Sequence, residues 1–148
     1  MALAIYLLAS NDSVLSQNGD LINPLAVTFD GRSGGYKQFR LYVRNNSALY
    51  YYDNITMTVQ DTSGNNIVDR SVDSFTWKLS EGDNQPTQAD WDNTAAANTI
   101  NFTDIGAPSS PDTSTFLPFW VRIEIPAGLD VQTFDDVQFV LHGQENLI

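Results

Sequence analysis

Apolar and polar residues alternate over several separate stretches of the sequence, and this period of two constrains the fold more than any other feature. In residues 38–44, for example, Phe39, Leu41 and Val43 alternate with polar or amphipathic residues. The same alternation recurs in residues 55–60, 74–80, 119–125 and 137–142. Successive side chains of a strand point to opposite faces of its sheet, so each stretch predicts a strand with one buried face.

Turn-forming pairs separate these strands, and there is little room for helices. Asn18-Gly19, Asp30-Gly31 and residues 61–66 are typical of turns. Thr87 to Asp90 resembles a helix capping box and predicts one short helix. About eight or nine short strands without alternating helices predict an all-β fold, an antiparallel β-sandwich of jelly-roll or immunoglobulin-like connectivity. The 148 residues form a single domain on this interpretation.

The residues on the apolar face of each predicted strand should meet between the two sheets and form the core. The expected core residues are Phe39, Leu41, Val43, Ile55, Met57, Val59, Phe75, Trp77, Leu79, Val121, Ile123, Val137, Phe139 and Leu141.

The composition excludes several classes of function. The chain has no cysteine and a single histidine, so disulfides, thiol catalysis and a multi-histidine metal site are excluded within one chain. Its 18 acidic and 7 basic residues give a formal charge of -11, which repels phosphate backbones. No stretch is long and apolar enough to span a bilayer, and we expect the apolar start of the chain to be retained. We therefore expect no cofactor, and neither nucleic acid nor membrane as a partner. Residues 61–66 supply oxygen atoms of the kind that bind calcium, but they lack the downstream bidentate Glu of an EF-hand loop and are better explained as a hairpin turn, so we also expect no bound metal.

No set of residues has the pattern of a catalytic site. Asp135-Asp136 and the pair Asp90 and Asp92 are the closest carboxylates in sequence, but turns and caps also favour aspartate. His142 lies on a predicted strand, and the Gly-x-Ser-x-Gly motif is absent. We expect no catalytic residues and no enzymatic activity.

Aromatic residues outside the predicted core are candidates for binding. Tyr50 and Tyr51 begin a run of three tyrosines, and Trp91 and Trp120 lie off the core faces. Exposed tyrosine and tryptophan can anchor a protein interface, pack within their own chain, or stack on sugar rings as in carbohydrate-binding modules. We favour the interface interpretation. Because neighbouring tyrosines on a strand point in opposite directions, at least one of the three should be in the core.

The N-terminal segment, residues 1–12, is predicted to be an apolar arm or an edge strand. Leu3, Ile5, Tyr6 and Leu7 are apolar on both strand faces, so the segment should be covered on both sides. It is either an internal strand of its own sandwich or a contact with a neighbouring subunit. We favour the contact, because the polar break that follows would allow the arm to reach a partner's sheet.

Two segments, about a third of the chain, resemble known phage proteins. Residues 118–128, Pro-Phe-Trp-Val-Arg-Ile-Glu-Ile-Pro-Ala-Gly, with a final strand that ends at Gly143, resemble the closing hairpin of small virion proteins from tailed bacteriophages. The stretch Arg-Leu-Tyr-Val-Arg-Asn-Asn at 40–46, followed by residues 55–59, is similar to strand pairs of immunoglobulin-like accessory domains.

The resemblance implies a capsid decoration (cement) protein on the outer surface of the virion. Proteins of this kind are small, acidic, mostly β and often trimeric, and they have no catalytic residues. The implied partners are the major capsid protein and further copies of the chain in a homo-trimer. A tail or baseplate protein and a carbohydrate-binding module are the alternatives.

Overall fold

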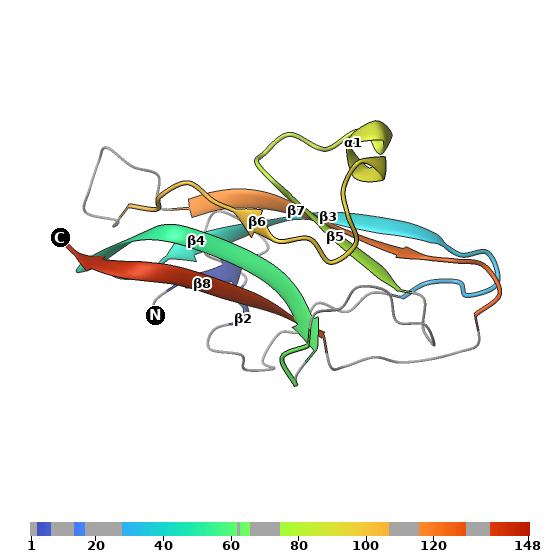
Figure 1. Ribbon diagram of the computed structural model, residues 1–148, viewed down its shortest axis with the longest axis horizontal. Helices are drawn as coiled ribbons and strands as arrows, with labels where there is room; N and C mark the ends of the chain where they lie inside the picture. The colour runs from blue at the N-terminus through green and yellow to red at the C-terminus, as the bar shows by residue number, and fades with distance from the viewer. Residues whose placement is uncertain are drawn as a thin grey trace.

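The computed structural model is a sandwich of two antiparallel sheets (Figure 1). It describes residues 3–6, 14–16, 28–61, 63–65, 75–106, 116–129 and 137–148. The larger sheet, sheet A, has the strand order β2-β1-β3-β7-β5, and the smaller, sheet B, has the order β6-β4-β8. The elements are β1 Leu3–Tyr6, β2 Val14–Ser16, β3 Gly35–Asn45, β4 Tyr50–Asp61, β5 Thr76–Glu81, α1 Gln88–Asp92, β6 Ile100–Asn101, β7 Phe116–Ile125 and β8 Val137–Leu147. The predicted all-β sandwich is confirmed.

The strand pairing follows the immunoglobulin pattern. In that fold, strands A, B, E and D form one sheet and strands C, F and G the other. Here β1-β3-β7-β5 take the order A-B-E-D, while β4 and β8 pair as C and F do. Among the described residues, no strand lies beside β8 in the place of strand G. The short β6 pairs with the opposite edge of β4.

The prediction that residues 118–128 and the final strand form a hairpin is wrong. β7 and β8, which contain the two segments that suggested it, belong to different sheets: β7 pairs with β3 and β5, and β8 pairs with β4. The chain therefore crosses from one sheet to the other between β7 and β8. Connections of this kind enclose the core of a Greek-key sandwich.

The core lies between the sheets and contains every expected residue except Phe75. Phe75 packs instead on the ring of Phe29, at 6.4 Å between centroids, and Phe29 in turn packs on the core. Tyr52 is fully buried and donates its hydroxyl hydrogen bond to Glu145 (2.8 Å), so one of the three tyrosines is in the core as expected. Phe119 joins Phe102 and Phe139 through edge-to-face contacts.

The edge-strand interpretation of the N-terminus is wrong. β1 is an internal strand of sheet A, paired with β2 on one side and with β3 on the other. All four of its residues are buried: Leu3 and Ile5 in the core, and Tyr6 on the opposite face. A strand that is apolar on both faces is stable when both faces are covered, and this chain provides that cover itself.

The predicted helix is present as α1. The Thr87 side chain accepts a hydrogen bond from the Asp90 backbone N–H, and the Asp90 side chain accepts one from the Thr87 N–H, so the capping box is complete. The helix then ends after little more than one turn. No helix in the described part of the chain is long and apolar enough to cross a membrane.

Candidate functional site

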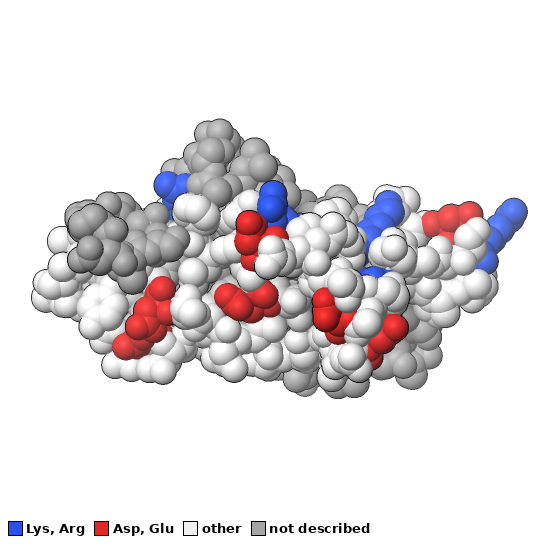
Figure 2. Space-filling model, turned by 90° about the horizontal axis from the view of Figure 1, so that it is seen from above, with Lys and Arg blue, Asp and Glu red and all other residues white. Residues whose placement is uncertain are grey.

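Among the residues that the structure describes, basic side chains lie on only one of the two sheets and in one adjoining turn. Every Lys and Arg that the structure describes belongs to sheet A or to the turn before β3. The strands of sheet B have Asp53, Asp61 and Glu145 but no Lys or Arg. Figure 2 shows the basic side chains along one long margin of the molecule and most of the acidic ones nearer the other. The two sides of the sandwich therefore present different charge to a partner.

The outer face of sheet A combines these basic side chains with aromatic rings, and we call it the arginine–aromatic face. Cross-strand pairing brings its members together, because Gln38, Arg40 and Arg44 on β3 lie opposite Arg122, Trp120 and Phe116 on β7. The face comprises Tyr36, Gln38, Arg40, Tyr42, Arg44, Lys78, Phe116, Trp120, Arg122 and Glu124. The alternation that puts apolar residues into the core also puts these residues on the outer side.

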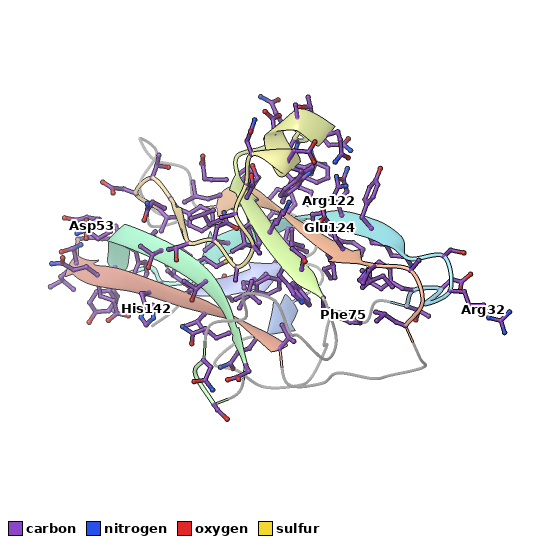
Figure 3. The ribbon with its side chains drawn as sticks, turned by 45° about the vertical axis from the view of Figure 1, so that its right-hand side comes forward. Arg32, Asp53, Phe75, Arg122, Glu124 and His142 are labelled. Atoms are coloured by element: carbon purple, nitrogen blue, oxygen red, sulfur yellow. The ribbon has the colours of Figure 1, made fainter. Side chains whose placement is uncertain are left out.

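One half of this face, the closed half, lies beneath α1 and centres on Arg122. The Arg122 side chain is buried although it is charged, and its guanidinium lies 3.7 Å from the centre of the Tyr36 ring. Its Nη2 donates to Gln88 Oε1 (3.0 Å), and its Nε lies 2.8 Å from Glu124 Oε1, although the Nε–H is not aimed at an acceptor. Figure 3 shows Arg122 and Glu124 together on sheet A beneath α1. These contacts compensate part of the cost of burying the charge.

Trp91 attaches α1 to the closed half. Its side chain is fully buried, and its indole Nε1 donates to Gln38 Oε1 (3.1 Å). The backbone oxygen of Trp91 accepts a hydrogen bond from Lys78 Nζ (2.9 Å), and Lys78 also lies 3.8 Å from Glu124. The predicted contact role of Trp91 therefore needs correction, because its ring packs within its own chain.

The other half, the open half, is accessible and centres on Arg40. The side chain of Arg40 is 45% exposed, and its Nη1 lies 3.0 Å from Asp83 Oδ1. The guanidinium also lies 5.9 Å from the Trp120 ring, whose Nε1 donates to the Asp83 backbone oxygen (3.1 Å). Arg40, Asp83 and Trp120 thus hold one another in a preformed, partly exposed cluster.

The open half continues along β3 and β7 toward β1. Arg44 lies over the Tyr6 ring at 5.9 Å, and the exposed Phe116 contacts the Tyr42 ring edge-to-face at 5.9 Å. The Tyr6 hydroxyl accepts a hydrogen bond from Asn46 Nδ2 (2.7 Å). Tyr6, a predicted contact residue, is thus buried beneath this face and supports it.

The remaining predicted contact residues lie elsewhere. Leu3 and Ile5 are in the core, so they offer no surface to a partner. Tyr50 is partly buried against the core, whereas Tyr51 is exposed on sheet B, away from Trp120. Leu7 lies outside the described residues. Of the predicted set, the structure therefore keeps Trp120 and Tyr51 at the surface, on different sheets.

The acidic residues and the histidine that the sequence analysis considered lie apart from one another where the structure describes them. The described residues contain no group of three or more His, Asp or Glu side chains that could hold a metal ion. Asp90 belongs to the helix cap, and His142 is exposed on β8. Asp135 and Asp136 lie outside the described residues.

The arginines of β3 were not among the predicted site residues. Their signal in the sequence is the polar face of residues 38–44, where Arg40, Tyr42 and Arg44 alternate with the core residues. A polar strand face that combines two arginines with a tyrosine has residue types that are enriched in interfaces.

Comparisons of the chain with protein-family models, with curated proteins and with solved structures give no match.

Proposed function

We propose that the chain is a non-enzymatic structural protein of a phage virion, which binds the outer surface of the capsid and stabilises the contacts between capsomers. The observation that carries this proposal is the open half of the arginine–aromatic face. Arg and Trp are enriched among the residues that dominate binding in protein interfaces, and here the exposed Arg40 and the partly exposed Trp120 lie together on an otherwise acidic molecule. The choice of partner comes from the sequence resemblance of residues 118–128 to small phage virion proteins, although the hairpin that this resemblance implied does not form.

The physics of a cement protein fits this arrangement. Such a protein stabilises a shell by binding the assembled form more tightly than its separate parts. A homo-trimer, which we also propose, would multiply weak contacts through avidity. Sheet B, with its carboxylates, would face outward and keep decorated particles apart by repulsion.

The arginine contacts favour a protein partner over a sugar. Stacking on a sugar requires an accessible ring face. The Arg122 guanidinium covers one face of the exposed Tyr36 ring, and Arg40 lies over the Trp120 ring. A carbohydrate-binding module, or a tail or baseplate position, remains the alternative outcome of the following experiment.

Co-sedimentation with capsids prepared without this protein tests the proposal. We expect the wild-type chain to sediment with capsids and Arg40→Glu to bind at least about tenfold more weakly, because it places a like charge against acidic groups of the partner. Arg32→Glu is the matched control: it makes the same charge change at one end of the molecule, away from the open half (Figure 3). We expect this control to bind as the wild type does.

Two results would overturn the proposal. One is a failure of the wild-type chain to bind capsids, both as a monomer and as a trimer. Sedimentation equilibrium gives the mass of the chain in solution and so shows which of the two forms is tested. The other is an equal loss of binding in Arg40→Glu and Arg32→Glu, which would leave the open half without a specific role.

A further inference from the structure

Asp83 contacts both members of the residue pair at the centre of the open half. Its side-chain Oδ1 accepts a hydrogen bond from Arg40 Nη1 (3.0 Å), and its backbone oxygen accepts one from Trp120 Nε1 (3.1 Å). Arg40 and Trp120 are cross-strand neighbours on β3 and β7, whereas Asp83 comes from the turn after β5. The Arg40 guanidinium also lies 5.8 Å from the Tyr42 ring and 5.9 Å from the Trp120 ring. A single residue outside the two strands therefore holds both side chains of the pair.

Asp83 belongs to residues 82–98, which connect β5 to β6 and include α1 (Figure 1), and we call this segment the strap. At the start of the strap, the backbone N–H of Gly82 donates a hydrogen bond to the Pro118 oxygen of β7 (3.1 Å). The φ angle of Gly82 is +109°, a conformation that glycine adopts readily because it has no Cβ. The chain can therefore turn from β5 toward β7 at this point and place Asp83 beside Trp120.

The rest of the strap is bound to sheet A at two further points. The fully buried ring of Trp91 attaches α1 to the closed half. After α1, the Asn98 side chain accepts a hydrogen bond from the Leu79 N–H and donates one to the Leu79 oxygen, both at 2.8 Å. Only residues 84–86 separate Asp83 from the capping box of α1. The attachment of α1 to the closed half therefore limits where Asp83 can lie on the open half.

We propose that Asp83 is a positioning residue of the open half: held in place by the strap, it fixes the orientation of Arg40 and Trp120 before a partner binds. A partner then does not have to order these side chains, and less conformational entropy is lost on binding. An ion pair as exposed as that of Arg40 and Asp83 adds little to the stability of a fold, so its effect is expected on binding. This role rests on the proposed function for the choice of capsids as the partner, but the order of the two side chains is a property of the free chain.

NMR of the isolated chain tests the positioning role without a partner. Asp83→Ala removes the carboxylate but keeps the backbone oxygen that accepts the Trp120 hydrogen bond. We expect the heteronuclear NOE of the Arg40 Nε–H to fall and the Trp120 indole N–H to exchange faster with water. The signals of Arg32, at one end of the molecule (Figure 3), are an internal control and should not change. Unchanged Arg40 and Trp120 signals in Asp83→Ala would overturn the proposal.

Co-sedimentation with capsids separates a positioning role from a simple effect of charge. If Asp83 only competed with the partner's acidic groups for Arg40, Asp83→Ala would bind capsids more tightly than the wild type. Positioning predicts the opposite, a loss of about two- to tenfold in affinity, because a partner must then order the freed side chain. Glu81→Ala is the matched control: it removes the same charge at the end of β5 and should bind as the wild type does. Binding of Asp83→Ala that equals or exceeds that of the control contradicts the proposal.

Two further variants test the hydrogen bond and the strap. Asp83→Asn keeps a side-chain oxygen that can accept from Arg40, so it should bind capsids more tightly than Asp83→Ala although both lack the charge. Trp91→Phe loosens α1 and should change the Arg40 and Trp120 signals in the same direction as Asp83→Ala; no change would contradict the role of the strap. A wild-type chain that binds no capsid would overturn the proposed function, and the NMR comparison would then decide the positioning role by itself.

Discussion

The closed and open halves of the arginine–aromatic face use the same residue types in opposite ways. Arg122 and Arg40 lie on neighbouring strands of one sheet face, and each contacts aromatic rings and one carboxylate. Arg122 is only 4% exposed beneath α1, whereas the Arg40 side chain is 45% exposed. The difference comes from the cover that α1 provides. The arginine beneath the helix makes its contacts within its own chain, whereas the arginine without this cover is accessible to a partner.

The largest expected effect is on the free energy of unfolding, and it distinguishes Trp91 of the closed half from Trp120 of the open half. Trp91→Ala should destabilise the fold by about 3–5 kcal/mol, because it empties a fully buried site and detaches α1 from the closed half. Trp120→Ala should cost clearly less, since its ring is partly exposed. Urea unfolding measures both.

A milder change keeps the Trp91 comparison measurable if Trp91→Ala does not fold. Trp91→Phe removes the hydrogen bond to Gln38 and part of the ring, and should cost about 1–2 kcal/mol. Equal losses of stability for Trp91→Ala and Trp120→Ala would break the distinction between the two halves.

The second prediction compares the arginines directly. Arg122→Met should cost about 2–3 kcal/mol, because it leaves Glu124 with only Lys78 as a partner in a partly buried setting. Arg40→Met should cost less than about 1 kcal/mol, the range of exposed ion pairs. Adding Glu124→Gln to Arg122→Met should restore part of the lost stability in urea unfolding. No recovery in the double variant would mean that packing, and not the stranded carboxylate, causes the loss.

The third prediction uses salt to separate the halves. Raising the ionic strength from about 0.01 to 1 M shortens the Debye length from about 30 to 3 Å and should weaken capsid binding through the open half. The stability difference between wild type and Arg122→Met should change little, because buried pairs are screened less. Co-sedimentation and urea unfolding over the same salt series give the two dependences. Salt-independent capsid binding would contradict a role for Arg40.

The smallest expected effect concerns the cap that holds α1 over the closed half. The hydrogen bond from the Thr87 backbone N–H, and then that from the Thr87 side chain, lower the pKa of Asp90 below its ordinary value. A carboxylate whose pKa is lowered by folding stabilises the folded state at pH above the unfolded pKa, and this contribution is lost as the pH falls through the folded pKa. We therefore expect α1 to loosen only in acid, below about pH 4.

NMR titration of the Ala89 and Trp91 amides measures this loosening. Asp90→Asn should remove the acid-dependent step, because it cannot ionise, and Asp92→Asn is the control that should keep it. An acid step that persists unchanged in Asp90→Asn would assign it to another group.

Much of the fold was predictable because it depends on local pattern. The period of two along residues 38–44 and 119–125 placed Leu41, Val43, Val121 and Ile123 in the core, and the structure confirms each of them. The capping residues Thr87 and Asp90 marked the start of α1 in the same local way. Sheet assignment was not predictable, since two strands with the same pattern can pair with each other or face each other across the core. The expected hairpin between β7 and β8 failed for this reason.

The sequence by itself determined which side chains share a strand face and that basic residues are few. It placed Trp91 and Trp120 outside the inter-sheet core, and both do lie on the outer side of sheet A. Only the tertiary structure decided that α1 folds back over Arg122 and leaves Arg40 accessible, that β1 is paired on both sides, and that β8 ends its sheet among the described residues. The physical reason is that burial and strand neighbours depend on segments far apart in the chain. A local pattern predicts on which face of its strand a residue lies, but it does not predict which other segment covers that face.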